Sequence, residues 1–383
     1  MRRAEHYDVV VLGGGPAGCA AALSLADRGI ERVLVVEASE YEAERVGESI
    51  PPDTRGLFSA LGLLRGFVAE GHEPCLGSCS SWGSDELGYN DFVFNPHGHG
   101  WHLDRRRFDA WMADRVRAKR IELRTSCAFV DHRREDPHGI ELGLRVGGHG
   151  GTSVRVRSHF VIDATGARAR FARRCRARPR ELDRLVVVWG YLEVPDETLV
   201  HIGRLTMLEA MEYGWWYLAR LPRQRVAVAL ATSTAIHKAR RFARAPGWLV
   251  ALGETRYLLP TLLEAEARPI PGSLAVCTAP SFLLDPVVDV SPSPRWLAIG
   301  DSASGFDPIS SQGIFKGLSD GLHGGRAVAA HLGGDSGALA THAARVRERF
   351  HGYVQQRAYF YGIEQRWAQA AFWRERVAAS MRD

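Results

Sequence analysis

The sequence predicts an α/β protein in which a parallel-sheet domain is interrupted by an antiparallel sheet and followed by a helical tail. Residues 7–12, 16–28 and 32–37 have the patterns of a strand, a helix and a strand, which is the order of a βαβ unit. Strand patterns then follow one another through residues 183–233, whereas a parallel sheet needs long connections between its strands. A short apolar strand at 296–300 returns to the first pattern.

The predicted parallel-sheet domain is discontinuous, over residues 1–180 and 280–335, with the antiparallel sheet over 181–279 and the tail helices over 336–383. A turn is expected near Pro137. The other expected elements are helices at 53–64, 103–120 and 313–332, and antiparallel strands at 185–194, 198–207, 214–221 and 225–231.

Composition favours an ordinary folded protein. The chain has 383 residues, 45% of them hydrophobic and 24% charged, with a formal net charge of +5. This charge is too small to indicate a nucleic-acid partner. No signal-peptide pattern and no membrane-spanning apolar run is found, so we expect a cytoplasmic protein without a membrane partner. Cys75 and Cys79 lack a second ligand pair at zinc-site spacing, so no metal is expected.

Residues 13–18 form a G-x-G-x-x-G motif directly after the first strand. Gly13 permits the tight turn, Gly15 lets a pyrophosphate approach the backbone, and Gly18 allows the helix to pack on the sheet. The helix amino terminus offers unpaired N–H groups to a diphosphate. Glu37 ends the second strand, where a carboxylate can accept the ribose hydroxyls of an adenosine. The motif therefore predicts a dinucleotide site.

Two further strand ends favour FAD over NAD. Residues 161–166 form a buried strand that ends in D-x-x-G, and a second apolar strand ends at Gly300 and Asp301. Strand ends so far apart in the sequence suit an extended cofactor. Asp301 is a candidate partner of the ribityl chain, and the helix that begins near Gly313 is a candidate partner of the isoalloxazine edge.

These elements resemble the flavoprotein monooxygenases that include p-hydroxybenzoate hydroxylase. Within that group, residues 47–52 (Gly-Glu-Ser-Ile-Pro-Pro) and 307–313 resemble the tryptophan-halogenase-like branch. The resemblance implies an FAD-binding Rossmann-like domain with an inserted antiparallel-sheet substrate domain. The expected FAD contacts are Gly13, Gly15, Pro16, Ala17, Gly18, Glu37, Ala38, Arg45, Gly47, Ser49, Arg105, Asp163, Gly166, Gly300, Asp301, Pro308, Gln312, Gly313 and Ile314.

The halogenase pattern itself is incomplete. Flavin halogenases use a lysine downstream of the Gly-Glu-Ser segment, and here the first lysine is Lys119. The halogenase W-x-W-x-I-P signature is replaced by Gly-Trp-Trp-Tyr at 214–217, and Ser310 occupies the position of a halogenase glutamate. Halogenation is therefore not expected.

Residues 82–87, 91–96 and 98–105 resemble a narrower subgroup, the LodB/GoxB-like maturases of tryptophylquinone-bearing lysine and glycine oxidases. This likeness implies an FAD-dependent monooxygenase that hydroxylates an indole or other electron-rich aromatic group. It also implies that the substrate is a tryptophan side chain carried on a peptide or protein.

Such chemistry requires an apolar cavity that excludes water and a group that accepts the ring proton. The candidate cavity residues are Trp82, Trp101, Trp215, Trp216 and Tyr217. The candidate catalytic residues are Glu48, His97, His99 and Ser310. Core packing of the tryptophans and a structural role of the histidines remain the alternatives. Aromatic residues at helical spacing in the tail, among them Tyr353 and Tyr361, favour packing over the core, with a docking face as the alternative.

Two other functions stay open. One is a flavin-dependent reductase or dehydrogenase of a small molecule, and the other is a non-catalytic, flavin-bound maturation factor. No second glycine motif for NAD(P)H is present, so NAD(P)H is expected to act through a separate flavin reductase.

Overall fold

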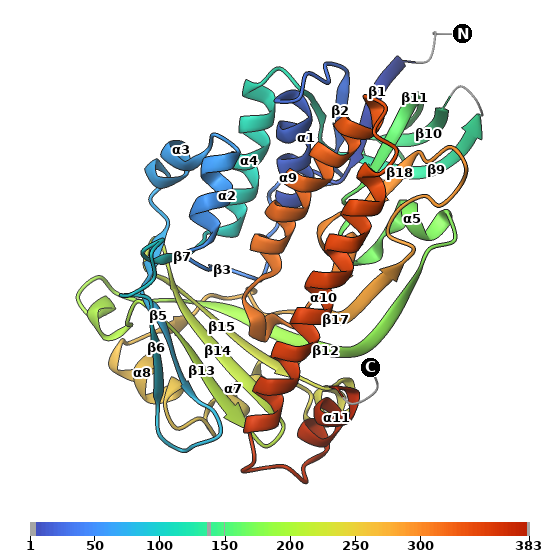
Figure 1. The fold of residues 1–383 in the computed structure, drawn as a ribbon. Coiled ribbons are helices and arrows are strands. Elements are labelled where there is room, and N and C mark those ends of the chain that lie inside the picture. Colours follow the sequence, from blue (N-terminus) through green and yellow to red (C-terminus); the bar gives the residue numbers. More distant parts are fainter. Residues whose placement is uncertain (1–4, 136–138, 149, 381–383) are drawn as a thin grey trace.

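Two large sheets organise the chain, and helices pack on both of them (Figure 1). The structure is a computed structural model that describes residues 5–135, 139–148 and 150–380. The turn expected near Pro137 lies outside the described residues. A third sheet of three short strands consists of β3 (Ser49–Ile50), β7 (Gly100–His102) and β4 (Glu73–Cys75).

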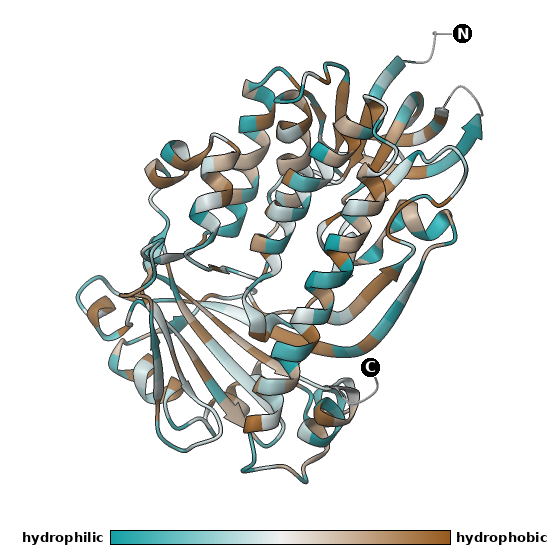
Figure 2. Ribbon diagram, viewed as in Figure 1, coloured by the Kyte–Doolittle hydropathy of each residue, from teal (hydrophilic) through white to brown (hydrophobic). Residues whose placement is uncertain are grey.

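The first large sheet has the strand order β8-β2-β1-β11-β10-β9, with β18 paired to β11. Val9, Val10 and Val11 are fully buried, as expected for a parallel strand covered on both faces. Figure 2 shows hydrophobic colour along these central strands. The strands are β1 (Glu5–Leu12), β2 (Val33–Val36), β8 (Glu122–Arg124), β9 (Cys127–Glu135), β10 (Gly139–Val146), β11 (Thr152–Asp163) and β18 (Trp296–Ala298). β1, β2, β8, β11 and β18 are parallel neighbours, and β9 and β10 are antiparallel.

The helices around this sheet differ from the prediction at two places, one of which is the unpredicted short helix α5 (Arg170–Arg174). The single helix expected at 53–64 is two short helices, because Gly62 adopts a φ of 67° and turns the chain between them. The side chain of Asp104 caps the next long helix by accepting from the backbone N–H of Arg107 at 3.1 Å. The helices are α1 (Pro16–Ala26), α2 (Thr54–Ala60), α3 (Leu64–Ala69), α4 (Arg105–Ala118), α5 (Arg170–Arg174) and α9 (Gly313–Leu332), with single 3₁₀ turns at Gly166–Arg168, Gly300–Ser302 and Pro308–Ser310.

A glycine stripe lets α9 lie directly against α1. Gly317, Gly321 and Gly325 recur every fourth residue and therefore share one face of α9. A Cβ atom at Gly321 would lie only 2.3 Å from the carbonyl oxygen of Ala17, and one at Gly325 only 2.8 Å from that of Ala21. These contacts run in the same order along both helices, so the two helices are parallel and their amino termini lie at the same end.

The second large sheet has the order β19-β17-β12-β15-β14-β13-β5-β6, with β16 paired to β12. The antiparallel pairing expected for this region is found from β17 through β13. The strand expected at 198–207 is wrong in part, because Leu199–His201 forms a 3₁₀ turn. The strands are β5 (Gly77–Ser81), β6 (Gly88–Asp91), β12 (Arg178–Glu193), β13 (Leu205–Met211), β14 (Gly214–Leu221), β15 (Arg225–Thr232), β16 (Arg268–Pro269), β17 (Ala275–Asp285) and β19 (Ser304–Gly305).

Two of these strands come from an unexpected part of the chain. β5 precedes the expected inserted domain in the sequence, yet it pairs in parallel with β13, and β6 pairs with β5. The second sheet therefore extends beyond the residues expected for it, 181–279. No periodic signal within β5 and β6 indicates this pairing, because they are short and rich in serine and glycine.

Each face of the second sheet has a different cover. Val188, Trp216 and Val228 pack on one face against short helices that the sequence analysis did not predict, whereas Trp189, Trp215 and other inward residues pack on the opposite face. The covering helices are α6 (Thr234–Arg240), α7 (Ala245–Leu252) and α8 (Leu258–Glu264). The tail forms α10 (Ala338–Ile363), which runs beside both large sheets, and α11 (Ala371–Ser380) (Figure 1). Among the described helices, none combines the length and apolarity needed to span a bilayer.

The substitution Gly321→Ala is expected to destabilise the fold, because the added methyl group collides with the backbone of α1. Overpacking of this kind costs about 1–3 kcal/mol. Gly352→Ala on α10 is the matched control, since a Cβ atom there meets nothing within 4 Å. The control is expected to gain about 0.5–1 kcal/mol from helix propensity. Urea denaturation measures both changes, and equal stabilities of the two variants would contradict the close packing.

Candidate active site

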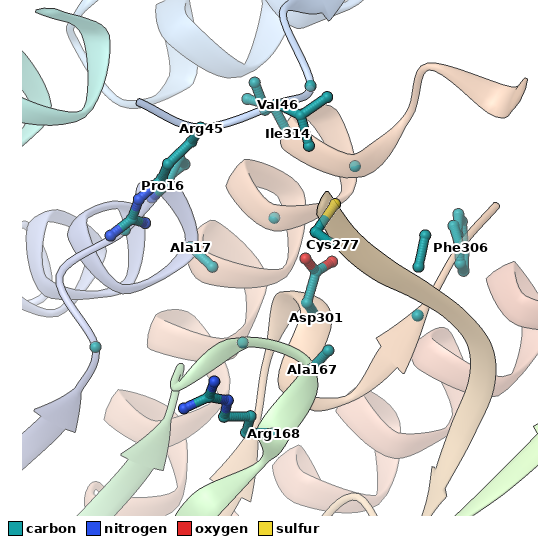
Figure 3. Close-up of a pocket in the computed structure, with 18 of the residues that line it drawn as sticks. Pro16, Ala17, Arg45, Val46, Ala167, Arg168, Cys277, Asp301, Phe306 and Ile314 are labelled. Atoms are coloured by element: carbon teal, nitrogen blue, oxygen red, sulfur yellow. The ribbon is translucent and has the colours of Figure 1, made fainter. Parts of the chain in front are cut away.

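A cavity of about 600 Å³ lies where the first sheet, α1, α9 and the inner face of the second sheet meet. Its volume is within the range of cofactor and small-molecule sites. Figure 3 shows Pro16 and Arg45 on one side of the cavity and Ile314 and Val46 on another, with Cys277 and Asp301 also among the lining residues. The cavity therefore joins residues from distant parts of the sequence.

The glycine turn forms one end of this cavity. Gly13 has a φ of 112°, and a Cβ atom there would lie 2.1 Å from the carbonyl oxygen of Ala164. Gly15 is different, because its nearest neighbour would be the Nη1 atom of Arg45 at 4.0 Å. Gly15 thus leaves an open cradle beside the backbone, which fits a pyrophosphate. Gly18 does not line the cavity, since its absent side chain makes room for the carbonyl of Gly13.

Both helix amino termini at the cavity are uncapped. α1 begins after Gly15 and α9 after Gln312, and neither has a side-chain cap. Gly13, Gly313 and Ile314 line the cavity beside these ends. The first N–H groups of a helix need partners, and their partial positive charge favours electron-rich ligands. The pair of helix ends therefore fits a cofactor with a diphosphate and an electron-rich ring system.

Glu37 follows β2 and lines the cavity beside the glycine turn. Its Oε2 atom accepts from the backbone N–H of Gly14 at 2.7 Å, and its Oε1 atom accepts from the backbone N–H of Ser39 at 2.9 Å. Arg45 is near it, with 3.9 Å between Nη2 and Oε1. Each carboxylate oxygen has more than one lone pair, so the fixed side chain can still accept from a ribose hydroxyl. Ala38 lines the cavity beside it.

Asp163 and Gly300 lie behind the cavity wall and do not line it. The fully buried Asp163 carboxylate accepts from the backbone N–H groups of Phe171 and Ala172 at 3.0 and 2.8 Å. Burial raises the pKa of Asp163, while these bonds oppose the rise. Gly300 adopts a φ of 58° and donates its N–H to Asp320 at 3.0 Å. Both residues shape the strand-end turns from which Gly166 and Asp301 reach the cavity.

Lys316 pairs with Asp301, a contact that sequence reasoning missed. The lysine is fully buried on α9, and its Nζ atom lies 2.8 Å from Oδ1 of Asp301. The ammonium also donates to the carbonyl of Ser304 and lies 4.5 Å from the ring centroid of Phe306. This pairing holds Asp301, which is about half exposed, at the cavity wall. A sequence signal for this contact was the position of Lys316 among small and apolar residues of α9, where a lysine needs a partner if it is buried.

The segment of residues 45–49, here called the strap, lines the cavity and carries Glu48. Arg105 holds the strap by donating to the carbonyls of Val46 and Gly47 at 2.8 and 3.1 Å. The Glu48 side chain is 2% exposed and accepts from the backbone N–H of Gly47 and the hydroxyl of Tyr191 at 3.0 and 3.3 Å. Burial raises the pKa of Glu48, and the nearby Arg105 charge opposes the rise.

Trp215 and Tyr217 line the cavity, but three other expected aromatic residues do not. Successive side chains of a strand point to opposite faces, so Trp216 lies on the far face of β14 against Trp248. Trp82 packs beside Trp215 and Trp373 outside the cavity. Trp101 packs in the first core, 5.1 Å from Phe67 between ring centroids. The expectation for Trp216, Trp82 and Trp101 as lining residues is corrected accordingly.

Three expected catalytic residues also lie away from the cavity wall. His97 is exposed in the loop after β6, and its carbonyl accepts from Arg55 at 2.9 Å. His99 contacts Trp101 and bonds to the carbonyl of Gly100. Ser310 donates to the carbonyl of Asp307 at 3.0 Å. Glu48 is therefore the expected catalytic residue that lines the cavity.

The remaining expected cofactor contacts line the cavity: Gly13, Gly15, Pro16, Ala17, Glu37, Ala38, Arg45, Gly47, Ser49, Arg105, Gly166, Asp301, Pro308, Gln312, Gly313 and Ile314. Other lining residues were not foreseen. Arg168 and Arg170 belong to an exposed basic stretch next to Gly166, whereas others come from β9, β17 and the turn before α9, among them Phe129, Cys277, Thr278, Ala279, Phe306 and Asp307.

The fold and the cavity define an FAD-dependent oxidoreductase with a Rossmann-like nucleotide domain. The sequence model of the family described as FAD binding domain matches residues 6–224, which is more than half of the chain. The chain belongs to that family, and the predicted fold class and FAD are confirmed.

Relatives support the same class. The protein LodB of Marinomonas mediterranea, whose name describes an FAD-dependent oxidoreductase, is 28% identical over 98% of this chain and 98% of its own. The structure of the flavin-dependent halogenase CmlS has a TM-score of 0.84 at 25% identity, covering 98% of this chain and 68% of its own. The peptidyl tryptophan dihydroxylase QhpG has a TM-score of 0.70 at 22% identity, covering 97% of this chain and 78% of its own. The resemblance to the LodB-like subgroup is thus confirmed.

The substitution Glu48→Gln is expected to change how stability depends on pH. Because burial raises the pKa of Glu48, the folded protein keeps this proton at pH values where the unfolded chain has lost it. The resulting stabilisation is complete below the ordinary carboxyl pKa of 4.5 and is lost as the pH rises through the raised pKa. The free energy of unfolding of the wild type, relative to that of Glu48→Gln, should therefore fall as the pH rises from 4.5 through the raised pKa of Glu48.

Urea denaturation of both proteins at a series of pH values measures this difference. Glu42→Gln is the control, because Glu42 is exposed on the same loop. A relative stability that stays constant, or that rises with pH, would contradict the raised pKa of Glu48.

Proposed function

We propose that the protein is an FAD-dependent monooxygenase that hydroxylates a tryptophan side chain carried on a peptide or protein. The observation that carries the proposal is that one cavity has a wall that suits an electron-rich cofactor and a wall that suits an aromatic substrate. The uncapped end of α9 forms one wall, and the aromatic face of β14, with Trp215 and Tyr217, forms the other. The names of LodB and QhpG support an oxidative reaction and, for QhpG, a peptidyl tryptophan.

Bound FAD, once reduced, supplies the activation of O₂ and the transfer of one oxygen atom to an electron-rich ring carbon. The protein supplies the surroundings of that step. Trp215, Ala229 and Ala231 present an apolar surface that excludes water from the ring. The buried Glu48 carboxylate is positioned to accept the proton that the ring loses as its aromaticity is restored. Electrons are proposed to come from NAD(P)H through a separate flavin reductase.

Halogenation is the second candidate, because the fold is shared with the halogenase CmlS. The positions of the three lysines of the chain argue against halogenation. Lys119 is exposed and pairs with Asp27 at 3.1 Å, and Lys238 lies on α6. Lys316, the third lysine, is buried behind the wall and engaged by Asp301. None of the three lines the cavity, so none is placed to deliver a halogen to a ring there.

The test is the transfer of labelled oxygen to a defined peptide. FAD-loaded protein is supplied with NADH, a flavin reductase, ¹⁸O₂ and peptides that each carry one tryptophan between varied neighbours. Intact-mass and fragment spectra are expected to show ¹⁸O on the tryptophan of at least one peptide. Matched peptides with phenylalanine in place of tryptophan are expected to stay unmodified.

Other outcomes separate the alternatives. Incorporation of chlorine or bromine in halide buffer, without ¹⁸O, would identify a halogenase. Modification of free small molecules without oxygen gain would favour a reductase or dehydrogenase. A Gly15→Asp variant, whose carboxylate repels the diphosphate, removes FAD; if that variant still supports maturation of a partner enzyme, the protein is a non-catalytic maturation factor.

A further inference from the structure

One stripe of the tail helix α10 faces the cavity loop that precedes α9. Tyr353, Arg357 and Tyr361 are spaced four residues apart and therefore lie on the same side of the helix. Their side chains are 3%, 1% and 0% exposed, although tyrosine and especially arginine are seldom buried so completely. The proposed reaction assigns no role to any of them, and hydrophobic packing alone does not explain three polar groups at one interface.

The first two residues of the stripe hold two consecutive cavity residues, Phe306 and Asp307. The ring of Tyr353 stacks on Phe306 with 4.1 Å between centroids, and its hydroxyl accepts from the backbone N–H of Asp307 at 2.8 Å. The Nε atom of Arg357 lies 3.6 Å from Oδ2 of Asp307, and its guanidinium also pairs with Asp183. Both Phe306 and Asp307 line the cavity. The tail helix thus fixes the loop that leads into Pro308–Ser310.

Tyr361 connects this loop to the opposite wall. Its hydroxyl donates to Oδ2 of Asp307 at 2.8 Å and accepts from the indole Nε1–H of Trp215 at 3.1 Å. The directions of these two hydrogen bonds follow from their end groups, because an indole N–H can only donate and a carboxylate can only accept. Tyr361 and Trp215 are each nearly inaccessible to solvent, so this hydrogen bond is shielded from bulk water. A single hydroxyl therefore joins the α9 side of the cavity to the β14 side.

We propose that Tyr361 is a positioning residue of the active site, which sets the indole of Trp215 relative to the cavity loop before α9 through Asp307. The tail helix α10 is then part of the active site as well as part of the core. The catalytic consequence rests on the proposed hydroxylation: a displaced Trp215 would admit water or misplace the substrate ring, and oxygen would leave as hydrogen peroxide. The physical linkage is independent of the reaction and can be measured alone.

The linkage is tested by NMR of the FAD-loaded protein labelled with ¹⁵N at tryptophan, in which Trp215→Phe assigns the indole resonance. Tyr361→Phe keeps the ring and removes the hydroxyl, so the Trp215 indole proton is expected to shift upfield. Asp307→Asn, which does not touch Trp215, is expected to shift the same resonance, and this effect should vanish in the Tyr361→Phe background. Tyr359→Phe is the control, since Tyr359 is 64% exposed on the same helix and should leave the resonance unchanged.

An unchanged Trp215 resonance in Tyr361→Phe, or an Asp307→Asn effect that persists without the hydroxyl, would overturn the linkage. In the peptide assay, the ratio of hydroxylated product to hydrogen peroxide is expected to fall about tenfold in Tyr361→Phe, the effect of one buried hydrogen bond. An unchanged ratio in a variant whose resonance has shifted would overturn the positioning role. If the wild type modifies no peptide, the proposed function fails, while the NMR result still decides the linkage.

Discussion

Close contact between α1 and α9 is the constraint on which the site depends. The contact depends on Gly321 and Gly325, which carry no side chain where the backbone of α1 passes. It brings two parallel helices together with both amino termini at the cavity, and neither terminus is capped by a side chain. The partial positive charges of both helices therefore converge on one space, which selects an electron-rich ligand. If the two helices moved apart, their partial positive charges would no longer act on the same ligand, and the cavity would also open.

The second sheet adds an apolar wall to the nucleotide-binding side of the cavity. Its inner face supplies aromatic and small apolar side chains, and its outer face is sealed by α6, α7 and α8. Three charged groups at this junction are buried with partners: Asp163 with backbone N–H groups, Lys316 with Asp301, and Asp307 with Tyr361. Burial without such partners would be costly, so these contacts explain how a water-poor chamber can contain charged walls.

The sequence predicted the parts of the site that depend on local chain geometry. Gly13 and Gly15 of the glycine turn, Glu37 after β2 and Gly313 at the start of α9 all follow from nearby residues, and all four line the cavity. The prediction failed where a side chain is placed by strand register or by distant packing. Trp216 points away because strand neighbours alternate, and Trp101 is fixed in the core by Phe67.

Contacts between remote segments could not be predicted for the same reason. Tyr361 and Trp215 are 146 residues apart, and no single-sequence pattern indicates that they meet. β5 and β6 joined the second sheet without a periodic signal, and the break between α2 and α3 depended on the positive φ of Gly62. The glycine motif therefore indicated the cofactor, whereas the residues that enclose the cavity could be identified only from the structure.

Hydrogen exchange of apo protein titrated with FAD tests the convergence of the two helix ends most directly. The amides in the first turns of α1 and α9 should both exchange more slowly as FAD binds, at the same FAD concentration, while those in the first turn of α11 should not change. Protection of α1 without α9, or of neither helix, would show that no single cofactor spans the two amino termini.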